Sequence, residues 1–256
     1  MDLSIITVTW NSEKKIENQI LSVISSCRNI TFEQIIIDNN SPDKTVEVVK
    51  KFNNVKLIEN KENKGFGAAN NQGIEIASGR FVLFLNPDMK VEGDALNRMV
   101  DYMVQNSNVG IAGCKLLNEN GELNLATTPR RFPKLWEQLF IVFKIHHFLP
   151  KILDRYLFRD FNPEVEQEVD SVQGSFMIVR RELIDKLGWG FDPRYFIWFE
   201  DVDLCREAKK NRYKVMYTPI ATCIDYAGQS FKKRTTWWKQ KQYIKSMLKY
   251  FIKWGV

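Results

Sequence analysis

Apolar residues in the first half of the chain follow two alternating periods. Short runs rich in apolar and β-branched residues cover positions 3–9, 34–38, 55–58 and 81–85. Stretches with apolar residues at helical spacing lie between these runs, which predicts βαβ units and a parallel sheet with helices on its faces. We expect helices at 16–24 and 46–52, and a third that runs to residue 78 from a glycine-bearing loop at 60–67.

The second half of the chain is less regular. Helical spacing returns at 94–105, and turn residues 118–121 between the stretches 109–117 and 122–126 predict a β-hairpin. A strand is expected at 172–181, where Gly174 and Ser175 would let a ligand approach the backbone closely. The long segment 129–168 is either an acceptor lid or a membrane-facing surface, or else a helix pair packed on the sheet.

A turn directly after the run 81–85 is the first candidate for chemistry. The run stops at Asn86-Pro87-Asp88, and ligands of open α/β sheets bind at the carboxyl ends of the strands. Pro87 cannot continue a sheet ladder, so Asp88 is expected on a turn with its carboxylate directed at a metal ion that carries phosphates. An ordinary type I turn is the structural alternative. The same edge of the predicted sheet carries Asn11, Asp38, Asn39 and Asp88.

A second acidic cluster follows the aromatic stretch that ends at Phe199. Glu200, Asp201 and Asp203 open a predicted helix that ends in basic residues, an order that complements the helix dipole. That structural reading does not explain why three acids directly follow an aromatic stretch. A carboxylate in an aromatic wall acquires a raised pKa, which suits a general base.

Composition indicates one domain with an appended segment. The 256 residues are 44% apolar, enough for a full core. The four cysteines are scattered, form no CxxC pair and follow no secretory signal, so we expect reduced thiols in a cytoplasmic protein and no structural zinc site. No apolar stretch approaches the roughly 20 residues that span a bilayer.

The positive charge of the chain is concentrated at its end. Eight Lys and Arg residues and no acid follow Asp225, more than the net charge of +6 of the whole chain. Tryptophan, tyrosine and phenylalanine are interleaved with these bases, a composition that suits peripheral contact with a membrane surface. An amphipathic helix packed on the domain, or a nucleic-acid patch, has a similar composition, and we predict no nucleic-acid partner.

The ordered motifs of this chain resemble those of a known family. It is similar to the inverting glycosyltransferases of family 2, in their rhamnosyltransferase-like branch, from residue 3 to about 230. The resemblance implies a GT-A (Rossmann-like) fold with a mixed, mostly parallel sheet flanked by helices. It divides the chain into a nucleotide-sugar half (1–115), an acceptor half (116–230) and a basic amphipathic segment (231–256). The motifs lie at 7–11, 38–43, 63–70, 85–88, 174–181, 190–192 and 199–203.

The resemblance also assigns roles to individual residues. Asp38 would accept the imide N–H of uracil or thymine, because a carboxylate accepts hydrogen bonds. Asp88 corresponds to the last acid of the family's DXD motif and would hold Mg²⁺ or Mn²⁺ on the diphosphate, with Asn86 at the first motif position. The predicted donor-nucleotide residues are Thr7, Thr9, Asn11, Asp38, Asn40, Asn63, Gly65, Asn70 and Asn86.

The acidic cluster would then supply the catalytic residues. Asp201 would be the general base, with Glu200 orienting the acceptor, although the two roles could be exchanged. Asp203 would hold the loop or cap the helix. The predicted acceptor-binding residues are Gly174, Trp198 and Glu200. Either Arg180 or Arg181 would meet phosphate, or both would be surface residues beside a strand end.

One position departs from the family pattern. The family usually has a His, often a metal ligand, where this chain has Asp225. A carboxylate is a good ligand for a hard cation, so Asp225 would either keep a site for Mg²⁺ or Mn²⁺, or mark weaker metal binding or an inactive member.

These residues together predict a metal-dependent transferase at the inner face of the cell membrane. It would move a sugar, first of all rhamnose, from a dTDP- or UDP-sugar to a hydroxyl of a growing cell-surface glycan, one that a polyprenyl carrier could hold. Two other hypotheses remain at this point: a nucleotidyltransferase of related layout, and a catalytically silent scaffold that binds nucleotides or glycans.

Overall fold

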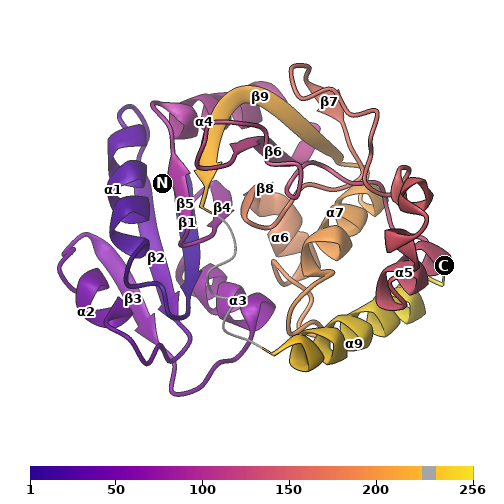
Figure 1. The fold of residues 1–256 in the computed structure, drawn as a ribbon. Coiled ribbons are helices and arrows are strands. Elements are labelled where there is room, and N and C mark those ends of the chain that lie inside the picture. The colour runs from indigo at the N-terminus through magenta and orange to yellow at the C-terminus, as the bar shows by residue number, and fades with distance from the viewer. Residues whose placement is uncertain (227–234, 256) are drawn as a thin grey trace.

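A computed structural model describes residues 1–226 and 235–255 of the chain (Figure 1). Its first half is a parallel α/β unit, in which β1 pairs with β2 and β4, and β2 pairs with β3. The predicted alternation of strands and helices is confirmed. The elements are β1 (Leu3–Thr9), α1 (Ile16–Ser26), β2 (Phe32–Asp38), α2 (Thr45–Val49), β3 (Val55–Glu59), α3 (Phe66–Ile76) and β4 (Phe81–Leu85).

The second half extends the same sheet with mixed pairing. β8 pairs antiparallel with β4 and β6, and β9 runs parallel to β6, so the strand order is β3-β2-β1-β4-β8-β6-β9-β5, with β7 beside β9. The predicted α/β class with a mixed sheet flanked by helices is confirmed. The elements are β5 (Met89–Val91), α4 (Ala95–Gln105), β6 (Val109–Leu117), α5 (Leu135–Val142), the 3₁₀ helices η1 (Ile145–His147) and η2 (Pro150–Leu153), β7 (Gln167–Glu168), β8 (Phe176–Arg180), α6 (Arg181–Leu187), α7 (Glu200–Lys210), β9 (Lys214–Asp225) and α9 (Thr236–Trp254).

The predicted hairpin at 109–126 forms only as a short antiparallel return at the end of β6. Leu117 is bridged to Leu123, the Asn118 N–H donates to the Glu122 carbonyl at 2.8 Å, and the Asn124 N–H donates to the Leu116 carbonyl at 2.9 Å. The Asn118 side chain accepts hydrogen bonds from the backbone N–H groups of Asn120 and Glu122, which closes the predicted turn. The rest of β6 pairs with the distant strands β8 and β9, so the second strand of the hairpin stays short.

Two further segments differ from the sequence prediction. The strand expected at 172–181 begins only at Phe176, because Gly174 and Ser175 form a turn ahead of it. Segment 129–168 contains one α-helix, α5, and two short 3₁₀ helices in place of a helix pair. Gly174 nonetheless lies where a backbone can approach a ligand, as described below.

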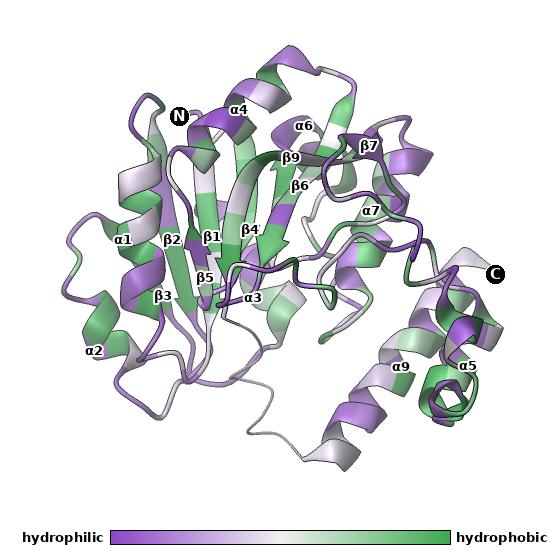
Figure 2. Cartoon of the chain, turned by 45° about the horizontal axis from the view of Figure 1, so that its top comes forward, coloured by the Kyte–Doolittle hydropathy of each residue, from purple (hydrophilic) through white to green (hydrophobic). Residues whose placement is uncertain are grey.

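Strand residues alternate between two core layers, one on each face of the sheet. In β4, Phe81, Leu83 and Leu85 join one layer, and Val82 and Phe84 join the other. Helices α1 and α4 cover the first layer, and α3, α6 and α7 cover the second. Burial on both faces explains the continuous apolar runs of the sequence, visible as green strands in Figure 2. The four cysteines are free and buried in or beside these layers.

The C-terminal helix α9 packs on the domain. Its residues Met247, Tyr250 and Phe251 form a third cluster with Tyr195 and Phe199. The interpretation of this segment as a packed amphipathic helix is thus confirmed for 235–255. Residues 227–234, with three of the predicted basic residues and the proposed boundary at 230/231, lie outside the described part of the chain. Among the described residues, no helix is both long and apolar enough to cross a membrane.

Candidate active site

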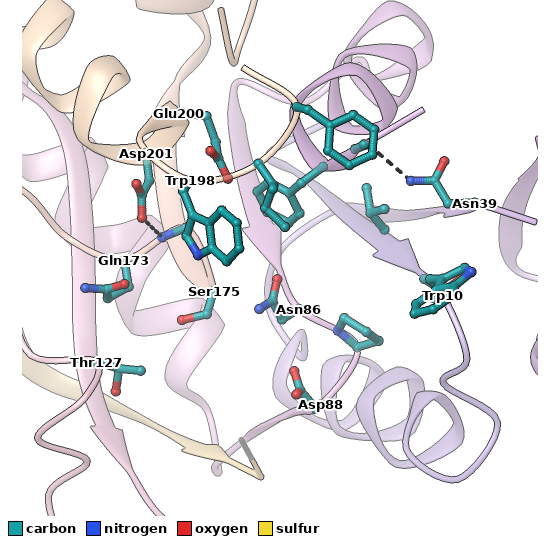
Figure 3. Close-up of a pocket in the computed structure, with 18 of the residues that line it drawn as sticks. Trp10, Asn39, Asn86, Asp88, Thr127, Gln173, Ser175, Trp198, Glu200 and Asp201 are labelled. Carbon is teal, nitrogen blue, oxygen red and sulfur yellow. Dashed lines mark hydrogen bonds between the residues drawn. The ribbon is translucent and has the colours of Figure 1, made fainter. Parts of the chain in front are cut away.

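A cavity of about 570 Å³ lies at the carboxyl ends of β1 and β4 (Figure 3). Its walls come from both halves of the chain and from the start of α9. The predicted site residues that line it are Thr9, Asn63, Gly65, Asn86, Asp88, Gly174, Trp198, Glu200, Asp201 and Asp225. Chain topology therefore brings together the Asn-Pro-Asp turn, the acidic cluster and Asp225, the residue that departs from the family pattern.

The turn after β4 is held by backbone contacts. The Asn86 N–H donates to the Ser175 carbonyl at 2.9 Å, and the Met89 N–H donates to the Asn86 carbonyl at 3.2 Å. Asp88 therefore lies in the turn between the end of β4 and the start of β5 at Met89, as the Asn-Pro-Asp sequence predicted. Figure 3 shows Asn86 and Asp88 on the cavity wall across from Glu200 and Asp201.

Asp88 and Asp225 lie at the same end of the β5–β9 ladder. Met89 is paired with Asp225, and the Tyr226 N–H donates to the Asp88 carbonyl at 3.0 Å. Asn124 Nδ2 donates to Asp225 Oδ2 at 3.2 Å. Two carboxylates suit Mg²⁺ or Mn²⁺, which take oxygen ligands and keep water and substrate phosphate oxygens in their shell. Within residues 1–226 and 235–255, no group of three or more His, Cys, Asp or Glu residues is arranged for a metal. The chemistry of these two carboxylates, rather than a complete set of protein ligands, is what fits such a cation.

Asp38 organises the carboxyl ends of β1 and β2. Its Oδ1 accepts from Thr9 Oγ1 at 2.9 Å and from Ser41 Oγ at 2.6 Å, and its Oδ2 accepts from the Ser41 N–H. The Asn11 N–H donates to the same Ser41 hydroxyl, with Asn11 in a left-handed conformation. Asp38 and Asn11 thus share a rim as predicted, but they lie beside the lined cavity, and only Thr9 reaches its wall.

Three predicted donor residues lie away from the cavity. Thr7 Oγ1 accepts from Gln19 Nε2 of α1 at 2.9 Å, so this hydroxyl faces the helix layer. Asn70 Nδ2 donates to the Phe66 carbonyl inside α3, and Asn40 is an exposed residue with positive φ. Local partners hold the side chains of Thr7 and Asn70, and the assignment of these two residues as nucleoside contacts stays a prediction.

Asn39 is a wall residue that motif reasoning placed on the rim but did not assign to the site. Its Nδ2 donates to the Gly65 carbonyl at 3.1 Å, and its Oδ1 accepts from Asn60 Nδ2 at 2.9 Å, so it fastens loop 60–65 to the end of β2. Gly65 has a φ of 90°, and a Cβ there would lie 2.6 Å from the Phe196 carbonyl. Glycine at this position therefore allows the two halves of the wall to meet.

The acidic pair begins α7 directly after a sharp turn. Trp198 and Phe199 both have positive φ, 65° and 69°, which reverses the chain and places the next two side chains at the cavity. Asp201 Oδ2 accepts from the Gly174 N–H at 3.1 Å, and Oδ1 accepts from the Val202 N–H at 2.8 Å. A Cβ on Gly174 would lie 3.3 Å from that of Asp201, so the small residue lets the carboxylate approach the backbone.

Electrostatics distinguishes the two acids. Burial raises the pKa of Glu200 well above its usual range, and the charge of Asp201 raises it further. Burial also raises the pKa of Asp201, but the N–H groups of Gly174 and Val202 and the charge of Arg130 oppose this rise. Glu200 Oε2 is buried and has no hydrogen-bond partner among the described residues. Within the pair, Asp201 is thus the group that ionises more readily.

Aromatic and hydroxyl side chains complete the wall. Trp238, from the start of α9, lies 6.5 Å from the Trp198 ring and 6.1 Å from that of Phe196. Ser175 Oγ is buried without a hydrogen-bond partner in the described part of the chain. Sequence reasoning missed the wall residues Thr127, Gln173, Phe196 and Trp238, because no local pattern links them to the motifs.

Neither Arg180 nor Arg181 lines the cavity, and the surface alternative is wrong for Arg180. Arg180 is buried and donates to the backbone carbonyls of Val109, Met103 and Asn106, whereas Arg181 is half-buried beside the end of β8. Arg181 donates to the carbonyls of Ala77 and Gly79. Both guanidinium groups donate hydrogen bonds to backbone carbonyls at the ends of other elements. The local sequence pattern of a strand cannot predict such distant partners.

Comparison with known proteins identifies the family. The glycosyl transferase family 2 sequence profile matches residues 4–188, more than half of the chain. The chain belongs to glycosyl transferase family 2. The resemblance recognised in the motifs is thereby confirmed, although the matched range ends before the acidic pair of α7.

Two curated relatives give the scale of this similarity. An uncharacterized glycosyltransferase of Haemophilus influenzae is 34% identical over 142 residues, 52% of this chain and 55% of that protein. An N-acetylglucosaminyl-diphospho-decaprenol L-rhamnosyltransferase of Mycobacterium tuberculosis is 26% identical over 246 residues, 89% of this chain and 77% of that protein. The match to the first relative spans about half of its length.

Solved structures share the fold. S. aureus TarS in complex with UDP-GlcNAc superimposes with a TM-score of 0.62 at 19% identity, over 92% of this chain and 62% of that chain. The mannosyltransferase PcManGT from Pyrobaculum calidifontis, in complex with GDP-Man and Mn²⁺, gives a TM-score of 0.64 at 16% identity, over 96% of this chain and 64% of that chain. At these identities the likeness supports the GT-A architecture alone.

Proposed function

We propose that this family 2 glycosyltransferase moves a hexose, first of all rhamnose, from a dTDP- or UDP-sugar to a hydroxyl of a growing glycan. The observation that carries the proposal is one cavity that Asp88, Asp225, Glu200 and Asp201 all line, with Asp88 across from Glu200 and Asp201 in Figure 3. Asp88 and Asp225 would hold a cation for the nucleoside diphosphate, and Asp201 and Glu200 would activate and orient the nucleophilic hydroxyl. Family membership and the presence of both acids favour a transferase over a silent scaffold or a nucleotidyltransferase.

The proposed reaction is a single displacement with inversion. Asp201 takes the proton of the acceptor hydroxyl while that oxygen attacks the anomeric carbon from the face opposite the diphosphate. The bond from the anomeric carbon to the diphosphate oxygen breaks, and the nucleoside diphosphate leaves with the electron pair. Burial favours the protonated form of Glu200, whose carboxyl group orients the acceptor sugar through a hydrogen bond. Trp198 offers a ring face for that sugar.

The diphosphate end of the cavity fits a divalent cation. Asp88 and Asp225 would hold Mg²⁺ or Mn²⁺, which neutralises charge on the leaving group when bound. Asp225 replaces the His that is usual in the family, and a carboxylate suits these hard cations. The mannosyltransferase PcManGT, which shares the fold, was solved with GDP-Man and Mn²⁺, and this supports the proposal of a metal-bound donor.

Relatives support the choice of donor and acceptor. The M. tuberculosis relative is a rhamnosyltransferase with a diphospho-decaprenol-linked substrate, and TarS binds UDP-GlcNAc. We infer a pyrimidine nucleotide, with the Asp38 carboxylate beside the cavity accepting the imide N–H of the base. A polyprenyl-linked acceptor would place the reaction at the inner face of the cell membrane.

Calorimetric titration of UDP and dTDP, each with Mn²⁺ and then with EDTA, tests the donor half of the proposal. We expect metal-dependent binding of at least one nucleotide, followed by transfer from a matched donor-sugar panel to a lipid-diphosphate acceptor. GDP serves as the control for base recognition. Absence of binding by every nucleotide with and without metal would contradict the proposed function and favour the silent scaffold.

A further inference from the structure

Two segments at one end of the molecule expose large apolar side chains. Phe143 is 69% exposed, Phe148 is 85% exposed and Ile252 is 80% exposed, although burying a residue of this size would normally stabilise the fold. The first segment is α5 with η1, and the second is α9. The exposed apolar residues are Leu135, Trp136, Leu139, Phe143, Phe148 and Leu149 in the first segment, and Trp237, Leu248 and Ile252 in the second.

The exposed apolar residues of α9 lie along the face of the helix that does not pack on the core. Trp237, Lys241, Leu248 and Ile252 are separated by four, seven and four positions, so they share one face of the helix. The opposite face carries the buried cluster around Tyr250. Lys241 Nζ lies 5.0 Å from the centre of the Trp237 ring, which sets a cation beside an aromatic on the exposed side.

The two segments are in direct contact. Tyr243 of α9 donates a hydrogen bond to Gln138 Oε1 of α5, and Val142 of α5 packs against the cluster of α9. Figure 1 shows both helices at the end of the molecule that carries the C-terminus, away from β3 and α2. We call the exposed apolar residues of these two segments, together with Lys144, Lys241 and Lys245, the basic apolar face.

The charged residues of the basic apolar face indicate what kind of partner it binds. In residues 134–153 the only acid is Glu137, which is buried and bonded to Arg155, and residues 235–255 contain no acid. The charged side chains that these segments expose are therefore lysines. Exposed aromatics and aliphatics interspersed with lysine fit the headgroup level of an anionic bilayer, where apolar area and basic charge both strengthen binding.

We propose that the basic apolar face docks this protein on the surface of an anionic lipid bilayer. The same helix carries Trp238 into the cavity wall, so docking sets the acceptor side of the cavity beside the bilayer. This inference deepens the proposed function, because it rests on a lipid-linked acceptor for its use, but bilayer binding itself requires no catalysis. Apolar side chains would enter the interface without crossing the bilayer.

Vesicle flotation with the full chain tests the docking surface. Wild-type protein should float with phosphatidylglycerol-containing vesicles, float far less with pure phosphatidylcholine, and be released by high salt. Leu248→Gln combined with Ile252→Gln should weaken binding to the anionic vesicles about tenfold, and Phe143→Ser combined with Phe148→Ser should act similarly. Leu21→Gln combined with Val104→Gln changes exposed apolar residues outside this face and should leave binding unchanged.

Three results would overturn the docking surface. Wild-type protein that ignores anionic vesicles would contradict it, as would face variants that bind like the wild type. A dimer in light scattering that the Leu248 and Ile252 substitutions disperse, with no vesicle binding, would assign the face to a second copy. Transfer to a detergent-solubilised acceptor separates the two proposals: it should survive the face substitutions, and its absence in the wild type would count against the proposed function alone.

Discussion

The donor side and the catalytic side of the cavity are assembled in different ways. On the donor side, Asp88 follows β4 of the parallel unit, whose strands and helices alternate along the first half of the chain. On the catalytic side, Asp201 begins α7 in the second half of the chain and accepts from the Gly174 N–H, 27 residues away. The strand end that carries Asp88 therefore arises from a repeated βαβ pattern, although Ser175 and Tyr226 also hold its turn, whereas no such pattern positions the acidic pair.

The clearest long-range contact joins α9 to the catalytic helix. Lys253 Nζ lies 3.0 Å from Asp192, 2.6 Å from Asp203 and 2.9 Å from Glu207, and the lysine is only 12% exposed. Trp254 Nε1 also donates to Asp203 at 2.7 Å. Asp203, predicted to hold the loop or cap the helix, thus connects α7 to the last turn of α9, two residues from Asp201.

Replacement of the general base tests the catalytic side most directly. Asp201→Asn should lower kcat by about 10³-fold, because general base catalysis contributes roughly 10²–10⁴-fold, and should leave nucleotide affinity intact. Steady-state transfer combined with calorimetry measures both quantities. The matched variant Glu200→Gln should show a smaller decrease in kcat. A larger loss in Glu200→Gln, or full turnover in Asp201→Asn, would assign the base to the other residue.

Removal of the C-terminal lysine tests how far the catalytic side depends on α9. Lys253→Met removes a cation that three acids share, and although Asp192 keeps Arg194 and Glu207 keeps Lys210, buried Asp203 loses its ion pair. The free energy of unfolding should therefore fall by about 3 kcal/mol, as for other broken buried ion pairs. Lys245→Met, on the exposed side of the same helix, should change it by less than about 0.5 kcal/mol. Denaturant unfolding measures both, and equal effects would show that the buried contact is not special.

The metal ligands test the donor side. Asp225→Asn should weaken Mn²⁺-dependent nucleotide binding by about tenfold, or ~1.4 kcal/mol, because a neutral amide is a poorer partner for a hard cation. Asp225→His restores the residue usual in the family and should keep metal-dependent binding. Titration with Mn²⁺ and with EDTA measures the difference. Unchanged binding in Asp225→Asn would remove this residue from the proposed metal site.

The pH dependence of stability gives the smallest effect. Burial raises the folded-state pKa of Glu200 above the ordinary glutamate value of 4.5, so the folded state binds this proton more tightly than the unfolded chain. The stability contributed by Glu200 is complete at pH values below 4.5 and is lost as pH rises through the raised pKa. Glu200→Gln should therefore gain stability relative to wild type as pH rises, and parallel unfolding curves would contradict this.

Local patterns were sufficient for much of the fold and part of the site. The alternation of apolar runs predicted the parallel unit, and the strand end at Asn86 predicted where Asp88 would lie. Acids at the start of one helix and bases at its end correctly marked α7. These features depend on residues within a few positions of one another, so a single sequence reports them.

Contacts between distant segments determined the features that the sequence did not predict. Thr7 and Arg180 sit at strand positions that looked available for a ligand, but Gln19 and three distant backbone carbonyls occupy them. The local hairpin after β6 stays short, because most of that strand pairs with β8 and β9, which lie far along the chain.

The sequence by itself determined the parallel α/β unit, the turn that carries Asp88 and the acidic start of α7, because each arises from local periodicity and turn chemistry. Tertiary structure alone decided that Trp238 closes the cavity and that Lys253 neutralises the acids behind Asp201. It also decided that Glu200 is the more strongly protonated acid of the pair. Burial and the contacts between distant segments, which set these features, exist only once the chain has folded.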